Sequence, residues 1–130
     1  MPTDIRKLVA SYVAAYNGAD WDGLAEHVTA DYIHHSGEQT LDFDGFVRGA
    51  TWLRAGFPDF SVEVLDVLVD GDRAAVRFEA RGTHEHSFFG EAPTMRTVVL
   101  DGITVYRVSE GGIAEDWEAM DEQQLRRQLA

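Results

Sequence analysis

The spacing of apolar residues changes near residue 60 of this 130-residue chain, from a helical period to a period of two. One apolar stripe at helical spacing opens the chain and consists of Ile5, Leu8, Val9, Tyr12, Val13 and Tyr16. Residues 73–84 instead alternate, with small and apolar side chains on one face and Arg73, Arg77, Glu79 and Arg81 on the other. A period of about 3.6 is typical of a half-buried helix and a period of about 2 of a half-buried strand. Helices followed by long strands predict an α+β fold.

Turn and capping residues divide the chain further. We expect helices to begin after Thr3 and after Asp20, a third helix over residues 42–55, and a closing helix capped by Asp121. The expected extended segments are residues 31–35, 60–69, 73–84, 96–108 and 113–120. Consecutive long strands joined by short turns predict an antiparallel meander.

The simplest arrangement of these elements is a cone. It has a curved antiparallel sheet of four to six strands, with three N-terminal helices and one C-terminal helix on the concave face, enclosing a hydrophobic pocket. Asp70-Gly71 predicts a tight hairpin turn. Gly82 and Gly102 lie inside strand patterns, so we expect bulges or bends there.

Composition limits the functional classes. The sequence has 11 Lys and Arg against 23 Asp and Glu, a net charge of −12, which argues against binding a nucleic-acid backbone or an anionic membrane surface. No apolar run reaches the roughly 18 residues of a membrane span, and residues 1–6 lack a signal pattern, so we expect a cytoplasmic protein. The chain has no cysteine, which excludes disulfides and thiolate metal sites, and we expect residues 1–130 to form one domain.

Acidic residues crowd the end of the last predicted strand. They are Glu115, Asp116, Glu118 and Asp121. In a regular strand Asp116 and Glu118 share one face, and Glu115 and Trp117 share the other. A carboxylate that faces the interior loses water and has a raised pKa, so it can act as an acid or base near neutral pH. The alternative is that these acids are solvated on the outer face, and the sequence leaves both open.

Histidine and phenylalanine residues supply further candidates. His84 lies on the apolar face of its predicted strand, either as a hydrogen-bonded core residue or as a catalytic one. Only one of His34 and His35 can point inward from a short extended segment. The histidine spacing does not support a metal site. Phe88 and Phe89 are adjacent in a predicted loop, where such pairs cover a pocket mouth or a partner subunit.

Residues 111–121, Gly-Gly-Ile-Ala-Glu-Asp-Trp-Glu-Ala-Met-Asp, resemble the closing signature of the SnoaL-like polyketide cyclases. Further similar pieces are residues 9–17, 31–32, 82–84, 92–94 and 125–129. The resemblance therefore covers nearly the whole chain. It implies the cone fold of the nuclear transport factor two-like superfamily, with a homodimer in which the charged outer face of the sheet is covered.

The resemblance also implies an activity. The family closes a ring by intramolecular aldol condensation of a polyketide ester without a cofactor, using an acid/base residue directly after the signature tryptophan. That residue is Glu118 here, where the family's usual residue is aspartate. The family's histidine on the preceding strand is replaced by Thr104, which can hydrogen-bond but cannot titrate. His84, Asp101 or one of the histidines at 34–35 would then take the place of that histidine.

We interpret the chain as a cofactor-free acid/base enzyme for a small hydrophobic carbonyl substrate, with Glu118, His84 and Thr104 as catalytic residues. The predicted substrate-binding residues are Tyr16, Tyr32, His34, His35, Trp52, Phe78, Asp101, Asp116 and Trp117. The alternative is a non-catalytic module of the same fold that binds a small hydrophobic ligand or dimerises. A third interpretation is water addition, as in epoxide hydrolases of this fold, which needs Asp101, Arg96 and Asp116 to converge.

Overall fold

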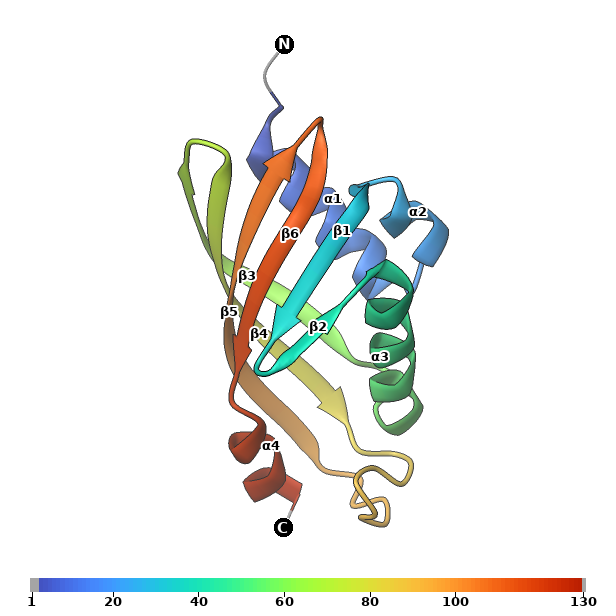
Figure 1. The fold of residues 1–130 in the computed structure, drawn as a ribbon. Coiled ribbons are helices and arrows are strands. Elements are labelled where there is room, and N and C mark those ends of the chain that lie inside the picture. Colours follow the sequence, from blue (N-terminus) through green and yellow to red (C-terminus); the bar gives the residue numbers. More distant parts are fainter. Residues whose placement is uncertain (1–2, 130) are drawn as a thin grey trace.

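The computed structural model describes residues 3–129, and Figure 1 shows an open, curved sheet with helices on one side. The helices are α1 (Ile5–Asn17), α2 (Trp21–Ala25), α3 (Phe43–Gly56) and α4 (Glu122–Leu129). The strands are β1 (Val28–Ser36), β2 (Gln39–Leu41), β3 (Ser61–Asp70), β4 (Arg73–Thr83), β5 (Thr97–Ser109) and β6 (Gly112–Met120). They form one six-stranded sheet in the order β2-β1-β6-β5-β4-β3. The predicted α+β cone is therefore confirmed.

Side-chain caps fix the helix starts close to the predicted positions. Asp20, Asp42 and Asp121 each accept a hydrogen bond from the backbone N–H three residues later, at 3.0, 2.8 and 3.0 Å. The first helix differs from the prediction, because the carboxylate of Asp4 rather than the hydroxyl of Thr3 accepts the capping hydrogen bond. An anionic cap also meets the positive end of the helix dipole, so Asp4 is well suited to this position.

The main departure from the prediction lies in residues 28–41. The expected brief extended piece at 31–35 belongs to a nine-residue strand, β1, which runs parallel to β6. The short strand β2, which the sequence pattern does not predict, folds back antiparallel on β1. The β1–β6 pairing joins residues 82 positions apart, as between His34 and Asp116, so no local pattern could reveal it. This pairing brings the histidines of β1 beside the acids of β6.

The strand glycines make room for aromatic rings instead of forming bulges. The β4–β5 register runs unbroken through Gly82 and Gly102, so the predicted bulges are wrong. A Cβ atom added at Gly102 would lie only 2.3 Å from the ring of Phe78, and one at Gly82 would lie 3.0 Å from Phe57. The absence of a side chain at these positions therefore lets each ring pack against the strand.

Two groups of buried side chains fill the space between helices and sheet. The first group packs α1 against the middle of the sheet and includes Tyr12 and Tyr106. The second lies toward α4 and includes Phe60 and Phe78. The cavity described below is lined by members of both groups, so it lies between them.

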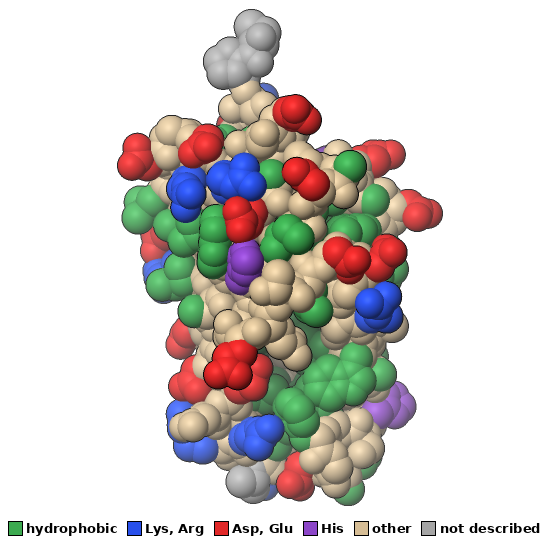
Figure 2. Space-filling view, viewed as in Figure 1, with side chains coloured by type: hydrophobic (Ala, Val, Ile, Leu, Met, Phe, Trp, Pro, Cys, Tyr) green, Lys and Arg blue, Asp and Glu red, His purple; other side chains and the backbone are tan. Residues whose placement is uncertain are grey.

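The outer face of the sheet is polar and charged, with some exposed apolar side chains (Figure 2). Arg73, Arg77 and Arg81 point outward as predicted, and two of them form ion pairs within the chain, Arg77 with Asp66 and Arg81 with Glu79, each at 2.6 Å. The homodimer expected from the resemblance stays a prediction. Among residues 3–129 no helix is long and apolar enough to cross a membrane.

Candidate active site

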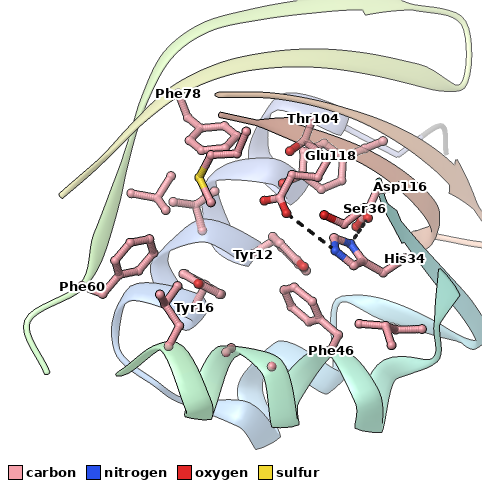
Figure 3. A pocket seen from close by; sticks show the side chains of 18 of the residues that line it. Tyr12, Tyr16, His34, Ser36, Phe46, Phe60, Phe78, Thr104, Asp116 and Glu118 are labelled. Atoms are coloured by element: carbon pink, nitrogen blue, oxygen red, sulfur yellow. Dashed lines mark hydrogen bonds and ion pairs between the residues drawn. The ribbon is translucent and has the colours of Figure 1, made fainter. Parts of the chain in front are cut away.

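A cavity of about 190 Å³ lies between the concave face of the sheet, α1 and α3 (Figure 3). Much of its wall is aromatic or aliphatic and includes Tyr12, Phe46, Leu53, Phe60, Phe78 and Met120. Polar side chains gather on the wall formed by β1, β5 and β6 and include His34, Ser36, Thr104, Asp116 and Glu118. A largely apolar cavity with a few convergent polar groups is typical of a small-molecule site.

Strand register arranges the polar side chains in two neighbouring rows across the sheet. The two rows are Ser36–Glu118–Thr104 and His34–Asp116–Tyr106, each read from β1 through β6 to β5. Adjacent rows are two residues apart along each strand, which is about 7 Å. Glu118 therefore lies between two hydroxyl-bearing residues, and Asp116 lies between an imidazole and a phenol.

Asp116 holds His34 in one orientation. The side chain of Asp116 is buried, its Oδ2 accepts a hydrogen bond from the Tyr32 hydroxyl at 2.6 Å, and its Oδ1 contacts Nδ1 of His34. An ionised carboxylate only accepts hydrogen bonds, so this contact assigns a proton to Nδ1. Nε2 of His34 then faces Glu118, whose Oε2 lies 3.7 Å away (Figure 3).

Glu118 and His34 form an acid–base pair with altered pKa values. Burial raises the pKa of Glu118 above its ordinary value, while His34 opposes the rise and Asp116 adds to it. Burial by itself lowers the pKa of His34, but the hydrogen bond and charge of Asp116 and the charge of Glu118 outweigh it, so the pKa is raised. With Glu118 as carboxylate and His34 as imidazolium, a proton acceptor and a proton donor stand side by side.

Tyrosine hydroxyls line the same cavity and keep their protons. Burial raises the pKa of Tyr12, Tyr16 and Tyr106, and the charge of Glu118 adds to the rise at Tyr16 while Arg54 opposes it. Tyr16 lies across the cavity from Glu118 (Figure 3). A neutral phenol is a hydrogen-bond donor, so these side chains can serve an oxygen that develops negative charge.

Six of the predicted site residues line this cavity. They are Glu118, Thr104, Tyr16, His34, Phe78 and Asp116. Tyr32 does not line the cavity but contacts residues that do: its hydroxyl donates to Asp116, and its ring packs against Phe46. Of the proposed replacements for the family's histidine, His34 is the one that the structure brings to Glu118.

His84 does not line the cavity, contrary to the expectation of a catalytic histidine there. It lies on the inward face of the sheet, as predicted, but eight residues beyond Val76, which pairs with Thr104. Eight residues of strand span roughly 26 Å. The His84 ring is fully buried, stacks on Phe57 at 5.4 Å, and accepts a hydrogen bond at Nδ1 from the Thr94 backbone N–H at 3.2 Å. Its environment is that of a core residue.

The remaining predicted residues lie on the outside of the cone. His35 and Trp117 stack on each other on the outer face of the sheet, with ring centroids 5.4 Å apart. Asp101 is also exposed there, whereas Arg96 is exposed in the loop before β5 and donates a hydrogen bond to Gln128 of α4, so the triad with Asp116 needed for water addition does not form. Trp52 lies outside the cavity, 52% exposed, and contacts Phe88 and Phe89.

Sequence reasoning missed several cavity residues. Ser36 lies two positions after His34, and Tyr106 two positions after Thr104, so each shares the inward face of its strand with a residue that was identified. Tyr12, which belongs to the apolar stripe of the first helix, lines the cavity, as does Phe46 of α3. Strand alternation places Tyr106 on the same face as Thr104, whereas the place of Ser36 depends on which of His34 and His35 points inward.

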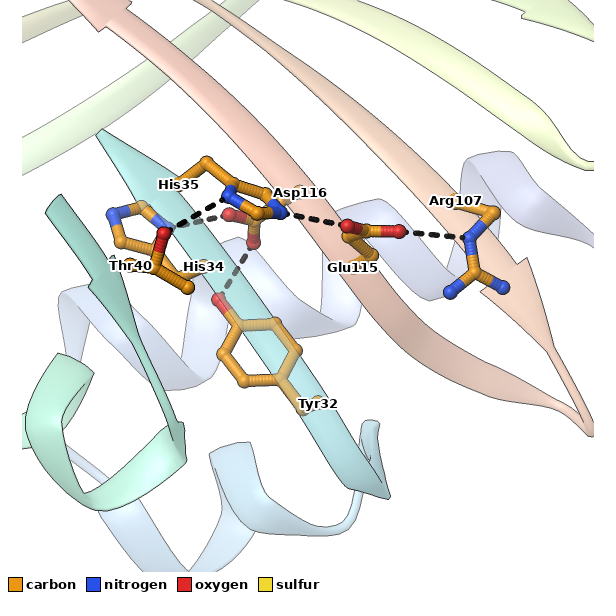
Figure 4. Close-up of polar contacts among 7 residues, drawn as sticks. All are labelled: Tyr32, His34, His35, Thr40, Arg107, Glu115 and Asp116. Carbon is orange, nitrogen blue, oxygen red and sulfur yellow. Dashed lines mark hydrogen bonds and ion pairs between the residues drawn. The ribbon is translucent and has the colours of Figure 1, made fainter. Parts of the chain in front are cut away.

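A second histidine–carboxylate pair lies on the opposite face of the same strands (Figure 4). Nε2 of His35 lies 2.6 Å from Oε2 of Glu115, and the other oxygen of Glu115 accepts a hydrogen bond from Arg107 at 3.3 Å. The hydrogen bond to His35 lowers the pKa of Glu115; burial opposes this effect and Arg107 adds to it. The side chains of His35 and Glu115 are 30% and 25% exposed.

The charged groups of the two pairs do not assemble into a metal site. Within the described residues, no group of three or more histidine, aspartate and glutamate side chains is placed to hold a metal ion.

Comparison with known proteins gives one family. The family described as SnoaL-like polyketide cyclase matches residues 6–129. No curated protein matched the sequence. Among solved structures, IdmH from Streptomyces antibioticus, described as a candidate polyketide cyclase, is 29% identical with a TM-score of 0.90, over 97% of this chain and 98% of that chain. AclR from Streptomyces galilaeus, described as a candidate hydroxylase, is 27% identical with a TM-score of 0.87, over 95% and 93% of the two chains.

Proposed function

Because the chain belongs to the SnoaL-like polyketide cyclase family, we propose that it is a cofactor-independent acid/base enzyme acting on a small hydrophobic carbonyl compound. The reaction is enolisation, followed in the full cycle by aldol closure of a ring. The observation that carries the proposal is the pairing of Glu118 with an Asp116-bound His34 on one wall of the cavity.

The first step is removal of a proton from carbon. Glu118 as carboxylate takes the proton from the carbon next to a carbonyl, and the electrons of the C–H bond move onto the carbonyl oxygen. The nearby imidazolium of His34 donates from Nε2 to that oxygen, and the Thr104 or Tyr16 hydroxyl supplies a second hydrogen bond. Donors already aimed at a developing oxyanion lower the barrier because they need little reorganisation.

The second step forms the ring. The enolate carbon attacks a second carbonyl of the same molecule, a carbon–carbon bond forms, and the resulting alkoxide takes the proton held by Glu118 or by His34. After proton exchange between these two groups, the site returns to its starting state. Asp116 keeps the proton on Nδ1 of His34 throughout, so that Nε2 remains the atom that exchanges protons with the cavity.

Proton exchange with solvent tests the first step without requiring the natural substrate. Ethyl 2-methylacetoacetate has one proton between its two carbonyls, and its exchange in D2O converts a methyl doublet into a singlet in proton NMR. We expect saturable exchange above the buffer rate, reduced 10²–10⁴-fold by Glu118→Gln, in keeping with loss of a general base. The control Glu115→Gln is on the outer face and is expected to change the rate less than twofold.

Exchange at the buffer rate, or equal rates in wild type and Glu118→Gln, would contradict the proposal. The same cone as a non-catalytic binding module then becomes the better interpretation. That module would bind the β-keto ester and return it with its proton unexchanged.

A further inference from the structure

The size of the cavity carries information about the substrate that the acid–base pair does not. Binding sites for drug-sized ligands occupy about 300–1,000 Å³. This cavity, which is partly open to the surface, has a volume of about 190 Å³. A dry protein cavity of about 150 Å³ holds one benzene molecule, so the present one has room for a single ring with a small substituent.

Phe78 lines one part of the cavity. It lies on β4 directly opposite Gly102 of β5, which in turn pairs with Met120 of β6. A Cβ atom at Gly102 would lie 2.3–2.8 Å from three atoms of the Phe78 ring, so the ring lies against the backbone where another strand residue would carry a side chain. Figure 3 shows this ring on the same side of the cavity as Glu118.

The Phe78 row is adjacent to the row that holds Glu118. Phe78, Gly102 and Met120 are each two residues along the strands from Val76, Thr104 and Glu118. This spacing corresponds to about 7 Å. A substrate carbon within reach of Glu118 therefore lies about one row spacing, roughly 7 Å, from the row of Phe78. Phe60, from the second core group, also lines the cavity.

Aromatic side chains of the first core group, with Phe46 packed against them, line the opposite part of the cavity. Phe46 of α3 lies 4.9 Å from the His34 ring, centroid to centroid, and 6.5 Å from the ring of Tyr12. Tyr12 in turn contacts Tyr106 at 5.6 Å. Large packed rings therefore limit the cavity on both sides of the polar wall.

We propose that the cavity takes a carbonyl compound with the bulk of a single six-membered ring, and that Phe78, packed on Gly102, sets this limit. The carbonyl group in this inference rests on the proposed function, whereas the size limit rests on the shape of the cavity alone. Larger apolar ligands ordinarily bind more tightly because they bury more surface, so a preference for the smaller ligand is a demanding test.

The probes are acetophenone, with one ring, and 2-acetylnaphthalene, with two fused rings. Both are neutral, because the cavity carries the carboxylates of Asp116 and Glu118, and none of the described residues that line it is Lys or Arg. Dissociation constants come from NMR titration of nitrogen-15-labelled protein, with the His34 imidazole signals reporting on occupation of the cavity. The variants are Phe78→Ala, Phe78→Leu in case the alanine variant does not fold, and the control Phe89→Ala, a similar truncation of a ring outside the cavity.

Wild type and Phe89→Ala are expected to bind acetophenone at least tenfold more tightly than 2-acetylnaphthalene. In a Phe78 variant the two-ring ketone is expected to bind at least as tightly as acetophenone. The inference is overturned if wild type binds the larger ketone as tightly as the smaller, if acetophenone leaves the His34 signals unchanged, or if a folded Phe78 variant keeps the wild-type ratio. Size selection without catalysed exchange of ethyl 2-methylacetoacetate would contradict the proposed function and leave this inference standing.

Discussion

Two histidine–carboxylate pairs occupy neighbouring positions of the same two strands and differ in nearly every property that matters for catalysis. His34 and Asp116 point into the cavity, and the His34 and Asp116 side chains are only 7% and 2% exposed. His35 and Glu115 point to the outer face and are 30% and 25% exposed. Both pairs have the same chemical groups, so the contrast arises from the alternation of side chains along a strand.

The surroundings of the two pairs shift the pKa values of Glu118, beside the inner pair, and Glu115, in the outer pair, in opposite directions. The inner pair faces a second carboxylate, Glu118, across 3.7 Å, and burial raises the pKa of that carboxyl. The outer pair is bound to Arg107, and its hydrogen bonds lower the pKa of Glu115, which makes this carboxylate a weaker base. An ion pair on a solvated surface contributes little to stability or to acid–base chemistry. The same groups in a cavity can contribute to stability and can also transfer protons.

The largest expected difference between the two pairs is in stability. Asp116→Ala leaves the Tyr32 hydroxyl and the His34 ring without their buried partner, so we expect a loss of about 3 kcal/mol in the free energy of unfolding. Glu115→Ala breaks half-buried contacts on the outer face of the sheet, and we expect a loss below about 1 kcal/mol. Urea unfolding followed by tryptophan fluorescence measures both, and equal losses would show that the inner pair is not the buried unit described here.

A smaller difference in stability is expected between variants of the residues that contact each pair, Tyr32 on the inner face and Thr40 on the outer face. Tyr32→Phe removes the donor to Asp116 and is expected to cost about 1–2 kcal/mol, since hydrogen bonds to charged groups are among the stronger ones. Thr40→Val removes a longer contact of 3.4 Å to His35 on the surface, and we expect a change within about 0.5 kcal/mol. The same unfolding measurement applies. A Thr40 variant as destabilised as the Tyr32 variant would contradict the assignment of inner and outer partners.

The smallest expected effect is the pH dependence of stability, which has opposite signs for the two pairs. The pKa of His34 is raised above 6.5, so its stabilisation is fully present below about 6.5 and is lost as pH rises through the folded-state value. The pKa of Glu115 is lowered below 4.5, so its stabilisation is present above about 4.5 and is lost as pH falls through the folded-state value.

Variants separate the two pH effects. In urea unfolding over a pH series, His34→Gln is expected to flatten the decline on the alkaline side and to leave the acid side unchanged. Glu115→Gln is expected to flatten the acid side alone. If His34→Gln altered only the acid side, the raised pKa of His34 would be wrong.

The sequence predicted which side chains of the last strand share a face, but not how far along the cone each one lies. Alternation placed Asp116 and Glu118 together, and the structure keeps them on one wall. The same reasoning put His84 on the inward face, correctly, yet the cavity ends before His84 is reached, because Phe57, Phe60 and Phe78 fill the space there. A periodic pattern therefore predicts the face of a strand on which a side chain lies. Whether that side chain reaches the cavity depends on packing between segments that are distant in the sequence.

The partner of Glu118 could not be predicted for a related reason. Thr104 replaces the histidine that the family resemblance leads one to expect on β5, and the imidazole is supplied by His34 of β1. The parallel pairing of β1 with β6 brings it there across 82 residues of sequence, measured from His34 to Asp116. Short extended segments such as residues 31–35 carry no signal for the strand they will join.

The central claim is that Glu118 and His34 form a coupled acid–base pair inside the cavity. Nitrogen-15 NMR titration of the imidazoles tests it most directly, with His34→Gln and His35→Gln identifying the signals. We expect a proton on Nδ1 of His34, a pKa of this imidazole above 6.5, and a lower pKa in Glu118→Gln, because the variant removes a nearby negative charge; Glu115→Gln is expected to leave the pKa of His34 unchanged. A His34 pKa at or below 6.5, or one that responds to Glu115→Gln and not to Glu118→Gln, would contradict the account.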